Sequence, residues 1–207
     1  MGWSCGEVSV EGIYPLKYWW VNQKQTYRHE VPGGYMWSPK RNRNGAYNRS
    51  YEAMRTVKPG DFIFSFAGGL LKAWGIATSY CDEFPKPDTF GTIGENWEDI
   101  GWRLDVRYKE ENCPVRPKDH IEAIRSFLPT MYSPLQANGN GNQNFYLVEL
   151  PKELAVALAH LMGRSILDII NGSTIAENIL DDRAVDNLLL WEDKIEESLV
   201  KDNSLPE

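Results

Sequence analysis

The residues best suited to binding chemistry lie together in Tyr35–Arg43, where an aromatic step leads directly into a cluster of cations. The segment reads Tyr-Met-Trp-Ser-Pro-Lys-Arg-Asn-Arg and follows a glycine pair. An aromatic ring stacks on any base that has left a nucleic-acid helix, which contributes roughly 1–3 kcal/mol per base. Neighbouring cations attract the phosphates that dominate affinity. The segment is therefore a candidate nucleotide platform, and the alternative is a buried aromatic pair before a polar loop. The platform consists of Trp37 with Lys40, Arg41 and Arg43.

The net charge of −7 is concentrated near the carboxyl end of the chain. Residues 151–207 carry twelve acidic and five basic residues, whereas residues 1–150 carry 17 of each sign. Positions 24–58 hold eight cations and two acids, a local net charge of +6. The local field, rather than the total charge, steers a polyanion to its docking site. Lys24 and Arg28 therefore join the predicted phosphate contacts, and the alternative is a solvated loop whose charges pair with distant acids.

Composition excludes several classes of protein. The chain has 207 residues, enough for one sizeable domain with an appendage. No apolar run approaches the ~20 residues that span a bilayer, and the first residues lack the pattern of a signal peptide. The cysteines Cys5, Cys81 and Cys113 are far apart and form no CxxC pair. This cysteine usage predicts a reducing, cytoplasmic compartment without a disulfide framework or a zinc knuckle. The short apolar runs predict no membrane partner.

Catalytic motifs are absent from the sequence. The histidines His29, His120 and His160 form neither HExxH nor a Cys/His cluster with metal-ligand spacing. There is no GxSxG elbow, no P-loop and no dinucleotide fingerprint after a strand. We therefore expect no cofactor, no metal and no catalytic activity from this chain, and a binding function becomes the default interpretation.

Local patterns predict a mixed α/β domain followed by a helical extension. Strand-forming runs occur at 18–22, 61–78 (a hairpin after a Pro-Gly turn), 102–108 and 145–148. Helical spacing occurs at 48–57 (with Asn48 as N-cap), 119–127, 154–162 (after Pro151) and 173–201. The composition shift predicts a domain over 1–160 and an acidic helical linker or dimerisation extension over 161–207. A small barrel and an open α+β sheet both fit the periodicity.

The order and spacing of several short motifs resemble the EVE domain of the PUA superfamily, which is similar to YTH readers of methylated adenine. The motifs lie at 18–23 (YWWVNQ), 34–39 (GYMWSP), 59–65 (PGDFIFS) and 73–77 (AWGIA). Three more, at 117–120, 132–135 and 138–143, resemble the N-terminal EVE domain of modification-dependent EVE–HNH endonucleases. The resemblance covers roughly residues 14–160.

The resemblance implies a PUA-like mixed β pseudo-barrel with short flanking helices and a pocket for one extruded base. In EVE–HNH enzymes the base is 5-methyl- or 5-hydroxymethylcytosine in duplex DNA, and a separate His-Asn-His domain cuts the strand. The nuclease motif does not occur in these 207 residues. We therefore expect a reader module. Through its C-terminal helix, this module would form a homodimer or be attached to a nuclease domain. The alternatives are a reader of modified RNA or N6-methyladenine, and a partner-binding module.

The pocket residues follow from the resemblance and from strand faces. Extruding a base costs a few kcal/mol, which aromatic walls and phosphate contacts offset. Trp37 matches the Trp-Ser step that supplies one wall in YTH readers, and we favour Trp97 over Phe90 and Trp102 for a second wall. Trp20 could form the floor of the pocket or belong to the core. Asn22 could bind the edge of the base or form hydrogen bonds with the backbone inside the barrel. The full predicted set is Trp37, Ser38, Trp97, Trp20, Asn22, Ser65 and Asn138.

Overall fold

The computed structural model describes residues 16–170, and the chain divides into two compact units, 1–158 and 159–207. In the second unit, the described residues comprise the end of α4 (Lys152–Met162) and α5 (Arg164–Ile170). The helix predicted at 173–201 lies outside the described residues.

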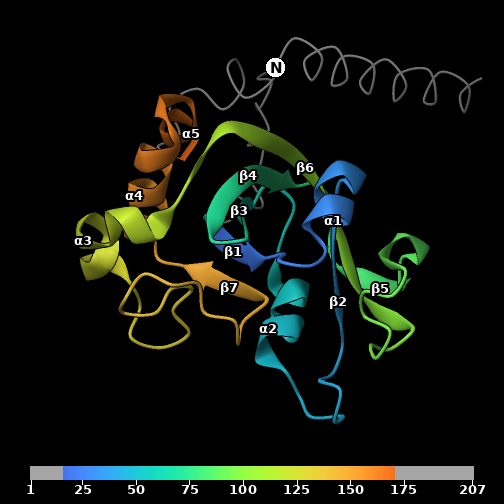
Figure 1. The fold of residues 1–207 in the computed structure, drawn as a ribbon. Coiled ribbons are helices and arrows are strands. Elements are labelled where there is room, and N and C mark those ends of the chain that lie inside the picture. Colours follow the sequence, from blue (N-terminus) through green and yellow to red (C-terminus); the bar gives the residue numbers. More distant parts are fainter. Residues whose placement is uncertain (1–15, 171–207) are drawn as a thin grey trace, which may run out of the picture. The chain divides into compact units, whose positions relative to one another are not determined.

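The first unit is built on one mixed sheet, which Figure 1 shows curled into a half-barrel flanked by short helices. Its strands are β1 (Tyr18–Asn22), β2 (Tyr35–Pro39), β3 (Phe62–Ala67), β4 (Leu70–Ala77), β5 (Asp82–Pro85), β6 (Ile100–Val115) and β7 (Leu147–Leu150). The strand order is β2-β6-β4-β3-β1-β7, and β5 also pairs with β6. β1 and β3 run parallel, and the other pairs are antiparallel. This arrangement confirms the predicted α+β fold class.

The long strand β6 connects the two parts of the sheet. Its first residues pair with β2 and β5, and the stretch from Val106 onward pairs with β4. In the run predicted as a strand at 102–108, buried and exposed side chains alternate from Leu104 to Arg107: Leu104 and Val106 are buried, whereas Asp105 and Arg107 are exposed. β6 therefore holds β2, with its aromatic residues, against the rest of the sheet.

Both faces of the central strands are buried. Trp19, Val21 and Ile63 point into a core cluster that also contains Met36 and Leu104. The opposite face carries aromatic side chains in contact with one another, Phe62 with Phe64 and Trp74, and Trp20 with Phe66. This accounts for the continuous burial of β1 up to Val21 and of the whole of β3.

The helices of the first unit are short. They are α1 (Tyr27–Gly33), α2 (Arg49–Glu52), η1 (Ala53–Thr56), η2 (Asp88–Phe90), η3 (Pro117–His120), α3 (Ile121–Ile124), η4 (Arg125–Phe127) and the start of α4. The side chain of Asn48 accepts a hydrogen bond from the Ser50 amide, which confirms its predicted role as N-cap. The helix predicted at 119–127 is instead three short turns, partly 3₁₀. α1 ends at Gly34, whose φ of 69° suits a residue without a Cβ.

Candidate functional site

A cavity of about 240 Å³ lies at the surface of the first unit, where five segments meet. These segments are the end of β1 with the loop that follows it, β2, the start of α2, the loop between η2 and β6, and the stretch before β7. Drug-sized ligands occupy about 300–1,000 Å³, so the cavity suits a smaller group. It is lined by Asn22, Lys24, Gln25, Thr26, Trp37, Pro39, Asn48, Tyr51, Trp97, Gln143, Asn144, Phe145 and Tyr146.

Trp37 is both a wall of this cavity and part of a small aromatic core. Its side chain is 1% exposed. The indole stacks on Trp97 at 5.9 Å between ring centroids and meets Phe90 edge to face at 5.7 Å. Its Nε1–H donates to the Phe84 carbonyl at 3.2 Å. The two tryptophans predicted to sandwich a base therefore contact each other directly in this structure.

Two glycines allow this aromatic arrangement. A Cβ on Gly101 would come within 2.4 Å of the Trp37 ring and 2.3 Å of the Ser38 carbonyl oxygen. A Cβ on Gly94 would come within 2.1 Å of the Trp97 ring, and Gly94 also has a φ of 73°. The sequence predicted neither role. Gly101 must accommodate Trp37 and Ser38, which are distant along the chain, whereas Gly94 must accommodate Trp97 three residues later.

Three aromatic residues that the sequence did not single out also line the cavity: Tyr51, Phe145 and Tyr146. Tyr51 and Tyr146 meet edge to face, with 6.3 Å between ring centroids. In the sequence, Tyr51 belonged to the apolar face of a helix, and Phe145 and Tyr146 belonged to a predicted strand. Such positions normally predict core, and the local pattern carried no signal for a cavity.

Polar groups stand among these rings. Asn22 donates through Nδ2 to the Asn142 carbonyl at 3.5 Å, so this predicted pocket residue lies at the cavity with a weak partner. Asn48 donates to Asn42 at 2.8 Å while its oxygen caps α2. Gln143, which is exposed, donates to the Gly141 carbonyl at 3.4 Å. Amides of this kind can donate to and accept from the edge of a base.

Four of the predicted pocket residues lie elsewhere. Trp20 is 2% exposed and packs on Phe66, so it is core and does not line the cavity. Ser38 follows Trp37 in β2, and successive side chains of a strand point to opposite faces. Its hydroxyl is buried and has no hydrogen-bond partner among residues 16–170. Asn138 is exposed and bonds the Asn140 amide within its own loop.

Ser65 is the fourth displaced residue, and it belongs to a buried polar network behind the cavity. Its hydroxyl donates to Gln23 Oε1 at 2.5 Å, and Gln23 Nε2 donates to the Tyr108 hydroxyl at 3.1 Å. Burial raises the pKa of Tyr108 well above its ordinary value. The network therefore consists of neutral groups around neutral pH, and Ser65 stabilises the interior.

Glu30 lies next to this network with no exposed surface. Its carboxyl accepts from the Trp37 amide at 2.7 Å and from the Tyr146 hydroxyl at 2.6 Å, and it also bonds the Thr26 hydroxyl. Burial raises the pKa of Glu30 to about 7, although these donors pull the pKa in the opposite direction. In the sequence, Glu30 was one of two acidic residues in a basic stretch, and nothing in the neighbouring residues predicted that its side chain is buried.

The predicted phosphate contacts separate into two groups. Lys40 pairs with Glu83 at 2.5 Å and lies over the Trp102 ring at 4.7 Å. Its amide and that of Arg41 donate to Glu98. In contrast, four exposed cations form no ion pair among the residues that the structure describes: Lys24, Arg28, Arg41 and Arg43. Lys24 also lines the cavity.

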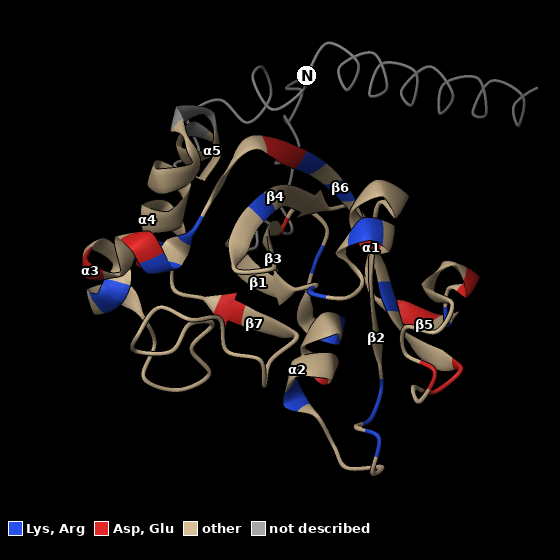
Figure 2. Ribbon diagram, viewed as in Figure 1, with Lys and Arg blue, Asp and Glu red and all other residues tan. Residues whose placement is uncertain are grey.

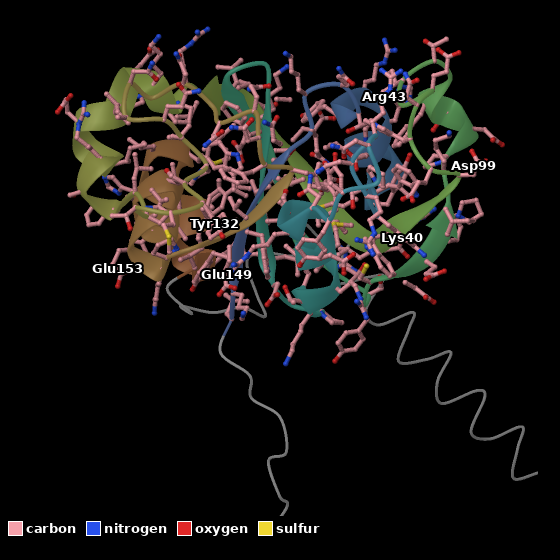
Figure 3. All side chains as sticks on the ribbon, turned by 90° about the horizontal axis from the view of Figure 1, so that it is seen from below. Lys40, Arg43, Asp99, Tyr132, Glu149 and Glu153 are labelled. Carbon is pink, nitrogen blue, oxygen red and sulfur yellow. The ribbon has the colours of Figure 1, made fainter. Side chains whose placement is uncertain are left out.

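Figure 2 shows how these charges are distributed along the fold. Lys and Arg colour the chain that leaves β2, whereas Asp and Glu gather on β5 and the loop after it. In Figure 3, Lys40, Arg43 and Asp99 are labelled on one side of the first unit, and Tyr132 and Glu149 on the other. The basic segment therefore has acidic neighbours, and only part of it is available for phosphates.

A second, larger hollow of about 1,020 Å³ adjoins the cavity and shares Asn48, Asn144 and Phe145 with it. The guanidinium of Arg49 lies 4.4 Å from the ring centroid of Tyr132, which is 44% exposed. The hollow also contains the exposed Tyr47 and Met131, and the cations Lys17 and Arg55. Lys17 and Arg55 pair with Glu149 and Glu52, so Arg49 is the cation without an acidic partner among the described lining residues.

Residues 16–170 contain neither a metal-binding cluster nor a membrane-spanning helix. No group of three or more His, Cys, Asp or Glu side chains there has the geometry to hold a metal ion. No helix in this range has the length and apolarity needed to cross a membrane.

Comparison with known proteins gives likenesses in fold at low identity. No protein-family model and no curated protein matches the chain. Similar solved structures include a protein from Pseudomonas syringae (13% identity, 70% of this chain and 99% of the other, TM-score 0.48). They include the Pho92 YTH domain in complex with m6A (14% identity, 71% of this chain and 86% of the other, TM-score 0.39). They also include human THYN1 in complex with 5-methylcytosine-containing DNA (12% identity, 72% of this chain and 98% of the other, TM-score 0.43). A likeness of this degree assigns no ligand to this chain.

Proposed function

We propose that residues 16–158 form a nucleic-acid reader that takes one unstacked, modified base into the cavity beside Trp37. The main observation that supports this proposal is the lining of one small surface cavity. It consists of aromatic rings, side-chain amides that can form hydrogen bonds with the edge of a base, and an exposed lysine. Rings supply stacking for any base, amides supply hydrogen bonds to a base edge, and the cation attracts the adjoining phosphate.

The base we propose is 5-methyl- or 5-hydroxymethylcytosine in double-stranded DNA. Support comes from the sequence resemblance to the EVE domain of EVE–HNH endonucleases, and human THYN1, which has a similar fold, is bound to 5-methylcytosine-containing DNA. The second candidate is N6-methyladenine or another modified base in RNA, because the Pho92 YTH domain is bound to m6A. Aromatic walls accept both kinds of base, so the polar groups at the edge must decide between them.

The deciding experiment compares affinities for matched ligands that differ at one base. Fluorescence anisotropy at one fixed salt concentration would use duplexes with cytosine, 5-methylcytosine or 5-hydroxymethylcytosine at the centre, and an RNA with adenine or N6-methyladenine. We expect tighter binding of a modified-cytosine duplex than of its plain counterpart. A preference confined to the methylated RNA would favour the second candidate. Equal affinity for every member of both sets would contradict a reader function.

The larger hollow offers a path for the nucleotides that flank the base. It adjoins the cavity, with which it shares three lining residues, and it presents the Arg49–Tyr132 pair at the surface. An exposed aromatic ring beside an arginine suits a neighbouring base and its phosphate. We propose that one strand runs from the cavity into this hollow.

In a longer protein, this module would supply specificity to a nuclease domain attached through the extension 161–207. The support is the resemblance to EVE–HNH enzymes, and a partner-binding or dimerisation role of the acidic extension is the alternative. Size-exclusion chromatography with light scattering would separate them for this chain. A monomer would argue against dimerisation, and a dimer that persists at low concentration would favour it.

A further inference from the structure

Glu30 is an acidic residue enclosed in the interior, and it forms no ion pair with any cation among residues 16–170. It lies in α1 and is 0% exposed. The titratable groups that face it are tyrosines: Tyr146 from the stretch before β7, Tyr108 from β6 and Tyr35 from β2. Burying a carboxyl group without a cation is costly, and it persists where hydrogen bonds compensate the charge. The position therefore needs an explanation beyond packing.

The hydrogen bonds to Glu30 come from three separate parts of the chain. Thr26 lies in the loop before α1, Trp37 in β2, and Tyr146, 116 residues away, in the stretch before β7. All three line the cavity, whereas Glu30 does not. The carboxyl group therefore ties three walls of the cavity together from behind, and we infer that Glu30 is the residue that positions those walls for recognition of the base.

The bond to Trp37 explains why a hydrogen-bond acceptor is needed at position 30. β2 lies at the end of the strand order, so within residues 16–170 one of its edges has no neighbouring strand. A buried N–H on such an edge must find an acceptor. Glu30 supplies this acceptor to the Trp37 amide, and it thereby fixes the strand position from which the indole reaches the cavity. An aliphatic residue at position 30 would leave that amide unsatisfied.

The ionised and protonated forms of Glu30 support the cavity differently. An ionised carboxyl group accepts from all of its neighbours at once. A protonated one can donate its hydrogen from Oε2 to the Thr26 hydroxyl, while Oε1 still accepts from the Trp37 amide and the Tyr146 hydroxyl, but as a neutral and therefore weaker acceptor. The pKa near 7 makes both forms accessible around neutral pH. Ionisation of Glu30 therefore strengthens the bonds that hold Trp37 and Tyr146 in place, and discrimination between modified and plain bases should be stronger at pH 8 than at pH 6.

This inference rests on the proposed function for its ligand, but part of its test needs no ligand. In ¹⁵N-resolved spectra of the full chain, the Trp37 amide proton should shift with pH around a midpoint of about 7. In Glu30→Gln, this shift with pH should be absent. His29→Asn, on the same helix, serves as the matched control and should keep the wild-type titration. A Trp37 amide that does not respond to pH, or responds equally in Glu30→Gln, would overturn the inference.

The ligand-dependent part measures the ratio of affinities for modified and plain duplexes. Glu30→Gln and Tyr146→Phe should each lower this ratio roughly tenfold, because a hydrogen bond to a charged group is lost or weakened. Binding of the plain duplex should weaken less than binding of the modified duplex, and thermal unfolding should confirm that the variants are folded. Two folded variants with the wild-type ratio and pH profile would overturn the inference. If the wild-type chain does not discriminate while the Trp37 amide titrates as expected, the reader function fails and the positioning role of Glu30 in the cavity stands.

Discussion

The indole rings of Trp37 and Trp97 are stacked, with 5.9 Å between their centroids and 26° between their planes. Trp37 is held by the core on its other sides, whereas Trp97 is half-buried on the loop between η2 and β6. Because the Trp37 side chain is 1% exposed, a base that stacks on its ring must displace Trp97. Trp97, on a loop and less buried than Trp37, is therefore the ring that we expect to be displaced.

Replacing Trp97 should weaken binding more than it weakens the fold. We expect Trp97→Ala to cost roughly 1–3 kcal/mol of binding free energy for a modified duplex, the value of one aromatic contact to a base. Anisotropy titrations measure this loss. Tyr80→Ala is a suitable control, because Tyr80 is 66% exposed and does not line the cavity. Equal losses in the two variants would argue against Trp97 as a wall.

Replacing Trp37 should instead destabilise the domain. Its side chain is 1% exposed and contacts Phe90 and Trp97. Truncating a large buried aromatic residue to alanine typically lowers the free energy of unfolding by about 3–5 kcal/mol. Urea unfolding of Trp37→Ala should show a loss in this range, with a smaller loss for Trp37→Phe. A Trp37→Ala variant with wild-type stability would mean that the ring is not part of the core.

The cations should contribute unequally to salt dependence. Each phosphate contact changes the slope of log K against log salt by about 0.9. Arg41→Gln and Arg43→Gln should therefore flatten the slope more than Lys40→Gln, because Lys40 is paired with Glu83. Lys118→Gln is the control, since Lys118 lines neither hollow. A larger effect from Lys40 than from either arginine would show that the pair with Glu83 opens on binding.

The contribution of Glu30 to the free energy of unfolding should fall as pH rises from 5 to 8. Glu30 has a pKa of about 7 in the folded chain and an ordinary value of 4.5, so at this site the folded state binds more protons between these values. This contribution is greatest below pH 4.5 and is lost as pH rises through 7, by up to roughly 3 kcal/mol. Urea unfolding at several pH values would measure it. Glu30→Gln should remove this dependence, and an unchanged slope in that variant would assign it to other groups.

The Arg49–Tyr132 pair tests the path of the flanking strand. We expect Tyr132→Ala to weaken binding of a modified duplex by roughly 1 kcal/mol or more, with Tyr132→Phe close to wild type, because the ring supplies the contact. The ratio between modified and plain duplexes should stay constant, since Tyr132 does not line the base cavity. A change in that ratio would place Tyr132 in base selection instead.

Much of the fold follows from local sequence. The run at 18–22 forms β1, the 61–78 segment forms the β3–β4 hairpin, and Asn48 caps α2. Each has a local cause, namely strand-forming side chains, a Pro-Gly turn and a capping amide. β5 had no such signal, because all four of its residues are exposed and only backbone pairing with β6 makes it a strand. α1 was also missed, since it is short and contains Pro32 in its last turn.

The sequence by itself determined the aromatic and basic chemistry of the segment around Trp37, the strands that carry it, and the absence of catalytic motifs. Tertiary structure decided which residues share the cavity. It brought Tyr51 and Tyr146 to Trp37, and it placed Ser38 on the opposite face of β2 and Ser65 in the interior. It also enclosed Glu30 behind three cavity walls. The physical reason is that propensity and alternation act over a few residues, whereas a cavity is formed by side chains up to about a hundred residues apart that only chain packing brings into contact.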